Sequence, residues 1–89
     1  MHCAIDALTV GLAREIAFEG IRVNAIAAGL IEAELHAAAG DPGRTARLSA
    51  LIPMRRTGTS DEVAESVRWL VSPSAAYVIA AIVAVSGGR

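Results

Sequence analysis

The residue types that most often carry out chemistry are sparse in this chain. Its 89 residues include one cysteine, one tyrosine and two histidines, and all eight basic side chains are arginines. Cys3 cannot form an intramolecular disulfide, and with His2 and the distant His36 it does not reach the ligand number and spacing of a zinc site. We therefore interpret Cys3 as a small residue on a helix face, and we expect no metal site.

Two glycine-bearing stretches are candidates for phosphate sites. A glycine-rich turn that holds a dinucleotide pyrophosphate lies between a strand and the N-terminus of a helix. Gly40-Asp41-Pro42-Gly43 follows no predicted strand, and no helix follows Gly87-Gly88. We interpret both stretches as turns, so the sequence predicts no dinucleotide cradle within these residues.

One segment does lead from a buried element into a loop that could meet a ligand. The run Ile21 to Ala27 is too short for a helix and lies between Gly20 and Gly29, which favours a buried parallel strand. A helix is expected before it, from about residue 3 to 19, with Gly20 as its C-terminal cap. The apolar residues that recur at helical spacing there are Ile5, Leu8, Leu12 and Ile16.

The second half of the chain predicts a βαβ unit. Thr59 and Glu62 have capping-box spacing at the start of a helix that Ser72-Pro73-Ser74 ends, and residues 78–85 form a second β-rich run. Two strands joined by a helical crossover should pair in parallel. Short helices are expected at about 32–39 and 44–51, between the first strand and the capped helix.

Several of these segments resemble the C-terminal part of a short-chain dehydrogenase/reductase, a family of nicotinamide-dependent oxidoreductases. The matching segments are Ala4-Ile5, Leu8-Thr9, Leu12-Ala13-Arg14-Glu15, Ile21-Arg22-Val23-Asn24 and the ending Tyr77-Val78 to Ser86-Gly87-Gly88. The resemblance covers essentially the whole chain. It implies an α/β fold, namely the C-terminal fragment of a Rossmann-like doubly wound sheet: a helix, then a βαβ unit with two parallel strands and a helical lid insertion. Residues 1–89 would be a single partial domain, with the substrate lid at about 32–52.

The resemblance also implies which residues face a ligand. The family's Pro-Gly-x-aliphatic-x-Thr loop, which contacts the nicotinamide, corresponds to Ala28-Gly29-Leu30-Ile31-Glu32-Ala33. Gly29, Leu30 and Ile31 are therefore the predicted cofactor-binding residues, although the proline and threonine are replaced by alanine. In the lid, Leu35, His36 and Leu48 are predicted to face the substrate. His36 has the alternative of a surface residue.

No catalytic residue is predicted. The family's catalytic lysine aligns with His2, and its tyrosine falls four residues earlier, before Met1. Tyr77 is interpreted as a packing residue before the last strand. NAD or NADP is expected in the intact family enzyme, and neither is expected to bind this chain alone.

Composition limits the remaining classes. The net charge is −1 and the arginines are scattered, so no nucleic-acid partner is expected. No apolar run is long enough for a membrane span and no signal peptide is evident, which favours a cytoplasmic protein. However, 54% of the residues are apolar, which is high for so small a domain.

Two functional hypotheses follow. The first is a truncated short-chain dehydrogenase/reductase, whose family oxidises or reduces an alcohol or carbonyl with NAD(P), and which is inactive as this chain alone. The second is a non-catalytic oligomerisation or interaction module, a homo-oligomer or a partner of related subunits. Met1, in the middle of a predicted helix that lacks an N-cap, supports the first. The high apolar content supports the second.

Overall fold

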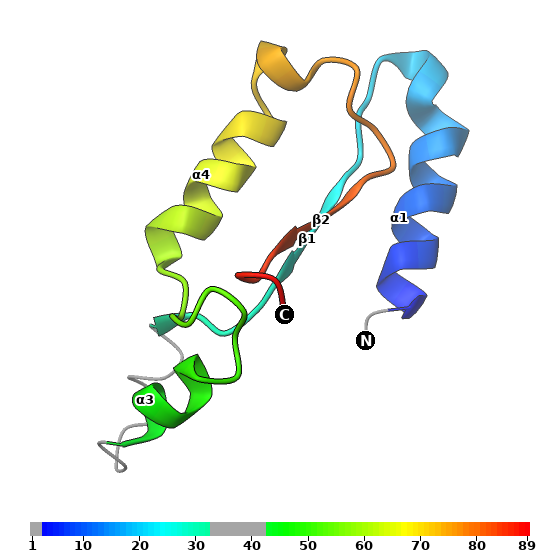
Figure 1. The fold of residues 1–89 in the computed structure, drawn as a ribbon. Helices are drawn as coiled ribbons and strands as arrows, with labels where there is room; N and C mark the ends of the chain where they lie inside the picture. The colour runs from blue at the N-terminus through cyan, green and yellow to red at the C-terminus, as the bar shows by residue number, and fades with distance from the viewer. Residues whose placement is uncertain (1–2, 33–42) are drawn as a thin grey trace.

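The computed structural model describes residues 3–32 and 43–89 and has an α/β architecture (Figure 1). The elements, in chain order, are α1 (Cys3–Ile16), a 3₁₀ helix (Ala17–Glu19), β1 (Ala25–Ala28), α3 (Arg44–Ser49), α4 (Ser60–Leu70), a second 3₁₀ helix (Pro73–Ala75) and β2 (Ile82–Val85).

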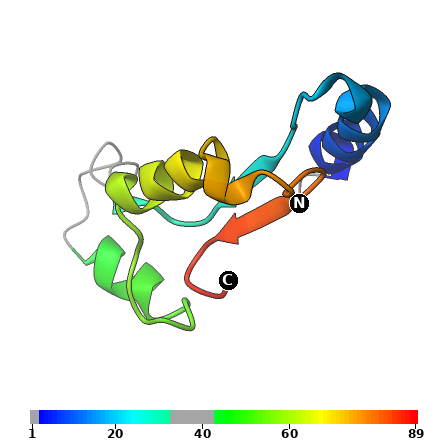
Figure 2. The same ribbon diagram turned by 90° about the horizontal axis from the view of Figure 1, so that it is seen from above.

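The two strands pair in parallel, as predicted. Ala25 is opposite Ile82 and Ala28 is opposite Val85, and α4 lies in the crossover between the strands. Helices α1 and α4 flank the strand pair on opposite sides (Figures 1 and 2). The expected fold class, a helix followed by a βαβ unit of a Rossmann-like fold, is therefore confirmed; the domain and lid boundaries stay predictions.

Both strands are shorter than predicted. β1 begins at Ala25 rather than Ile21, and β2 begins at Ile82 rather than Val78. Side-chain hydrogen bonds interrupt the regular ladder here: Asn24 donates from Nδ2 to the Val78 carbonyl at 2.9 Å and accepts from the Ala81 amide at 3.0 Å. One backbone bond, from the Ala80 amide to the Val23 carbonyl at 2.9 Å, joins the two segments before the strands begin. The positive φ of Ala80, 59°, also interrupts the extended backbone. The apolar pattern carried no information about these bonds.

The first helix forms as expected but presents its apolar stripe outward. The 3₁₀ turn extends α1 to Glu19, and Gly20 follows it with φ 78°, a left-handed conformation suited to glycine. Thr9 and Ala13 are the buried positions, whereas Leu8 is 67% exposed. Ile5 and Leu12 are exposed with it.

The helix predicted from Thr59 is confirmed together with its cap. The Thr59 hydroxyl accepts from the Glu62 amide at 3.2 Å, and the Glu62 carboxylate accepts from the Thr59 amide at 3.0 Å. The predicted helix at 44–51 is α3, which ends at Ser49. The helix predicted at 32–39 falls almost entirely outside the described residues.

The core within the described residues is thin. Five apolar side chains are buried: Ala13, Ile31, Ile52, Leu70 and Ala75. Among the large ones, only Ile52 is almost completely buried, with 1% of its surface exposed. Tyr77 was predicted to pack in the core, and this was wrong: its side chain is fully exposed. Ala75, at the end of the second 3₁₀ helix, takes the inward position instead.

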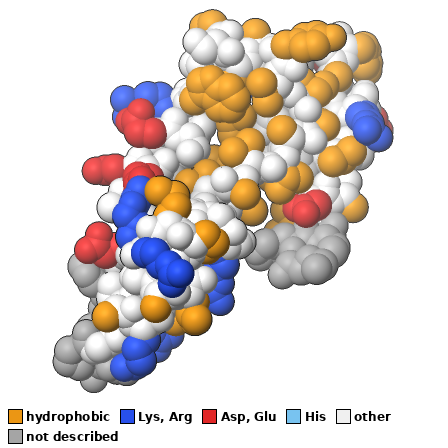
Figure 3. All heavy atoms as spheres, viewed as in Figure 1, with side chains coloured by type: hydrophobic (Ala, Val, Ile, Leu, Met, Phe, Trp, Pro, Cys, Tyr) orange, Lys and Arg blue, Asp and Glu red, His pale blue; other side chains and the backbone are white. Residues whose placement is uncertain are grey.

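The surface is unevenly divided. Hydrophobic side chains gather over the region of α1 and the strands, and charged side chains lie mostly along α3 and α4 (Figure 3). Phe18, next to the end of α1, is 86% exposed. Within the described ranges, none of the helices has the length and apolar character that a membrane crossing requires.

Candidate functional site

Gly29, Leu30 and Ile31 lie directly after β1, at the carboxyl end of the strand pair. The Gly29 amide donates to the Val85 carbonyl at 3.0 Å, which continues the parallel ladder one residue beyond β1. Ile31 is buried and forms an isolated parallel bridge with Gly58. Ligands of open α/β sheets bind at the carboxyl ends of strands, so the loop predicted to contact the cofactor occupies the expected edge.

The packing around Gly29 requires glycine. A Cβ on Gly29 would lie 2.9 Å from both Cα and Cβ of Ser86, closer than real carbon atoms approach. Ser86 follows β2, so the absence of a side chain at Gly29 lets the two strand ends run close together. This is a structural reason for Gly29, independent of the cofactor contact that the family resemblance implies.

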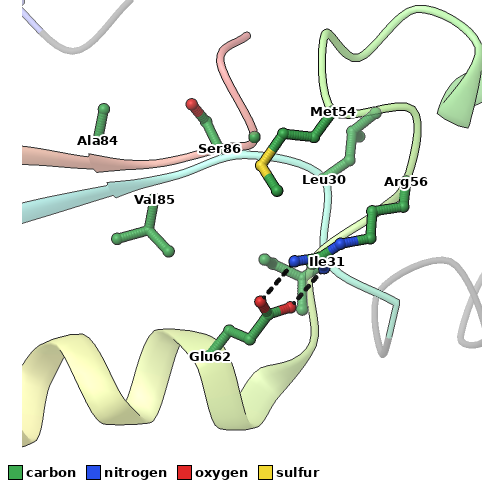
Figure 4. Close-up of a pocket in the computed structure, with 10 residues that line it drawn as sticks. Leu30, Ile31, Met54, Arg56, Glu62, Ala84, Val85 and Ser86 are labelled. Carbon is green, nitrogen blue, oxygen red and sulfur yellow. Dashed lines mark hydrogen bonds and ion pairs between the residues drawn. The ribbon is translucent and has the colours of Figure 1, made fainter.

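A cavity of about 230 Å³ opens beside this loop. Its lining comes from the loop after β1, the segment before α4, the first turn of α4, and the end of β2 with the residues after it (Figure 4). The lining residues are Leu30, Ile31, Met54, Arg56, Gly58, Glu62, Ala84, Val85, Ser86 and Gly87. The walls are mostly apolar, and the charged groups in them are Arg56 and Glu62.

Arg56 and Glu62 form a two-pronged ion pair at this cavity. Nη1 and Nη2 of Arg56 donate to Oε1 and Oε2 of Glu62 at 2.7 and 2.8 Å (Figure 4). The hydrogen bond from Arg56, followed by that from the Thr59 backbone, lowers the pKa of Glu62 to about 2. The same pair raises the pKa of Arg56 above its ordinary value. Both groups are therefore charged at neutral pH.

The remaining predicted site residues lie in or near the lid region. Leu35 and His36 lie outside the described residues. Leu48 is on α3 and half-buried, and it is not among the residues that line the cavity beside Leu30. Their assignment to the substrate stays a prediction. In the ranges 3–32 and 43–89, no group of three or more potential metal ligands occurs.

Sequence reasoning missed the role of the segment before α4. The sequence assigned residues 55–58 to no helix or strand and interpreted Glu62 as half of a capping box, whereas Arg56, Gly58 and Glu62 also line the cavity. The one signal in the sequence was that Arg56 and Glu62 lie on either side of Gly58 and of the helix cap at Thr59. That pattern does not reveal that Gly58 pairs with Ile31.

The chain is similar to known oxidoreductases along its length. The family model described as enoyl-(acyl carrier protein) reductase matches residues 1–89. An uncharacterized oxidoreductase of Escherichia coli K12, YgfF, is 46% identical over 86 residues, which is 97% of this chain and 35% of that protein. The chain thus spans about a third of the length of this curated relative.

Solved structures of oxidoreductases are also similar to this chain. A 3-oxoacyl-[acyl-carrier protein] reductase from Brucella melitensis superposes with a TM-score of 0.87 at 38% identity, covering 97% of this chain and 32% of that one. A short-chain oxidoreductase from Pseudomonas aeruginosa PAO1, described as containing an atypical catalytic center, gives a TM-score of 0.82 at 32% identity, with 97% and 37% covered. The chain belongs to the short-chain dehydrogenase/reductase family of oxidoreductases.

Proposed function

We propose that these 89 residues form one wall of the nicotinamide site, and the base of the substrate lid, of an NAD(P)-dependent enzyme that interconverts an alcohol and a carbonyl. The proposed cofactor-facing residues are Gly29, Leu30 and Ile31. NAD and NADP are both compatible with the proposal, and a cytoplasmic location fits it.

The observation that carries the proposal is the placement of the 29–31 loop. In a chain whose family uses nicotinamide cofactors, this loop leaves the carboxyl end of β1 and is hydrogen-bonded on both sides, to Val85 and to Gly58. A loop fixed in this way presents backbone groups in one orientation before any ligand arrives. Such preorganisation lowers the cost of binding.

We further propose that the 89 residues transfer no hydride by themselves. The sequence contains no lysine, and its one tyrosine, Tyr77, precedes β2. Because the strands are parallel, Tyr77 and Gly29 lie at opposite ends of the strand pair. The tyrosine and lysine that would act as general acid/base and its partner are therefore missing beside the loop.

A turnover assay tests this proposal. Purified chain is mixed with NADH or NADPH and a panel of carbonyl compounds, or with the oxidised cofactors and alcohols, and nicotinamide absorbance is followed. We expect no change above the rate without protein. Reproducible turnover that Gly29→Trp abolishes would overturn the proposed inactivity.

A second function, association with a copy of itself or with related subunits, is favoured by one observation. The outward stripe of α1, Ile5, Leu8 and Leu12, is exposed, and such apolar surfaces commonly mark interfaces. Sedimentation of the chain and of Leu8→Lys tests it. Association is expected for the chain and weaker association for the variant, and a folded monomer in both cases would count against this function.

A further inference from the structure

The segment from Arg56 to Glu62 closes on itself. Arg56 and Glu62 at its two ends are joined by the two-pronged ion pair, and the Thr59 amide donates to the same carboxylate at 3.0 Å. The Thr59 side chain in turn caps α4. We call residues 56–62 the closed loop. Its ends are held by side chains, and Gly58 lies inside it.

Gly58 uses both of its backbone groups toward the 29–31 loop. Its amide donates to the Leu30 carbonyl at 2.9 Å, and its carbonyl accepts from the Glu32 amide at 2.8 Å. A Cβ on Gly58 would lie 3.2 Å from Cδ1 of the Ile31 side chain, so Gly58 packs closely against that side chain. The direction of the Gly58 backbone therefore decides where Leu30, Ile31 and Glu32 lie.

We propose that Arg56 and Glu62 are positioning residues: their ion pair holds the closed loop so that Gly58 fixes the backbone of residues 30–32. Neither side chain needs to touch a ligand for this role. The proposal rests on the proposed function only in taking residues 29–31 to face the nicotinamide. The ion pair and the backbone bonds of Gly58 lie within this chain and need no cofactor.

The same helix offers a contrasting pair. Arg68 and Glu65 lie three residues apart on α4, with one contact of 3.3 Å and side chains 75% and 65% exposed. Exposed pairs of this kind contribute little to stability. The Arg56–Glu62 pair is also partly exposed, so we assign its importance to the loop that it closes rather than to its strength.

Amide hydrogen exchange of the 89-residue chain, measured by NMR, tests the proposal. The variant Glu62→Gln removes the charge pairing but retains a side chain that can complete a capping box. The amides to follow are those of Gly58 and Glu32. The reference amides are those of Ala25 and Gly29, which donate to Ala81 and Val85 across the strand pair.

We expect Glu62→Gln to speed exchange at Gly58 and Glu32 by at least about threefold relative to the reference amides, because the local closure is weakened more than the fold as a whole. The control Glu65→Gln should leave the exchange rates of all four amides unchanged. Equal acceleration at all four amides would mean a global loss of stability and would overturn the proposal, as would unchanged exchange at Gly58 and Glu32.

A second series covers the case in which Glu62→Gln does not fold. Arg56→Met removes the pair from its other end, and Arg56→Lys restores the charge without the two-pronged geometry. Exchange at Gly58 and Glu32 should be fastest in Arg56→Met and intermediate in Arg56→Lys. The same exchange in both variants as in the unsubstituted chain would overturn the proposal. These readouts involve no cofactor, so a failure of the proposed function would be recognised separately.

Discussion

The two ends of the strand pair are held in different ways. At the carboxyl end, backbone groups of Gly29, Leu30 and Glu32 bond to β2 and to Gly58. At the amino end, side chains add to the backbone bond from the Ala80 amide to the Val23 carbonyl. Asn24 bonds to Val78 and Ala81, and Arg22 donates to the Leu70 carbonyl at 2.7 Å.

Their surfaces differ as well. The amino end exposes large apolar side chains, including Phe18, Val71 and Tyr77. At the carboxyl end Ile31 is buried, although Met54 beside it is exposed. The carboxyl-end loop thus obtains its geometry from neighbouring residues of this chain. The apolar side chains at the amino end find no cover among the described residues. The candidate site is therefore locally determined, while the opposite end is suited to further packing.

The largest expected effect is at the carboxyl end. Gly29→Val would place a branched side chain against Ser86, whose Cα and Cβ lie 2.9 Å from where the new Cβ would stand. We expect a loss of about 1 to 3 kcal/mol in the free energy of unfolding, measured by urea denaturation.

Gly11 in α1 is the matched control for Gly29. A Cβ there meets no atom within 4 Å. Gly11→Ala should therefore stabilise the chain by about 0.5 to 1 kcal/mol, since alanine favours a helix interior. Equal effects at Gly29 and Gly11 would contradict the close packing of the strand ends.

At the amino end, Asn24→Ala should cost about 1 to 2 kcal/mol in unfolding free energy. It leaves the Ala81 amide without its side-chain partner, and it leaves the Val78 carbonyl with only the longer bond from Arg22 at 3.4 Å. Urea denaturation measures the loss. A change below about 0.5 kcal/mol would show that water replaces the amide and that side chains do not hold this end.

Thr59→Ala should cost about 1 kcal/mol, because the first turn of α4 loses the hydroxyl that accepts from the Glu62 amide. Thr59→Ser keeps that hydroxyl and serves as the control. Thermal unfolding of both variants distinguishes a lost cap from a lost methyl group, and equal destabilisation by alanine and serine would reject the cap as the cause.

The smallest effect expected is the pH dependence contributed by Glu62. Its folded-state pKa of about 2 lies below the ordinary 4.5. The stabilisation of the fold by ionised Glu62 is therefore fully present at pH values above the ordinary pKa, and it is lost as the pH falls toward 2. Glu62→Gln should flatten this part of the stability profile below about pH 5, measured by urea denaturation at stepped pH values. If the free energy of unfolding changed with pH in the same way in Glu62→Gln as in the unsubstituted chain, the lowered pKa of Glu62 would be contradicted.

The fold was largely predictable because its signals are local. The Thr59–Glu62 cap, the Gly20 turn and the order of helix and strands all follow from patterns within a few residues. The strand starts were not predictable, since Asn24 and Arg22 bond to residues distant in the chain, Val78 and Leu70. The family resemblance assigned Gly29 to Ile31 to the cofactor, which stays a prediction. Gly58 could not be found in this way, because it pairs with Ile31 across the chain. The exposure of Tyr77 likewise depends on tertiary packing that sequence neighbours do not report.

The most direct test of the central claim is hydrogen–deuterium exchange of a chimera. It joins these 89 residues to the part of the Brucella melitensis 3-oxoacyl-[acyl-carrier protein] reductase that precedes its matched segment. We expect NADH or NADPH to slow exchange in peptides covering residues 29–32 and to leave exchange in the second half of α4 unchanged. Cofactor binding with unchanged exchange at residues 29–32 would contradict the claim that this loop faces the nicotinamide.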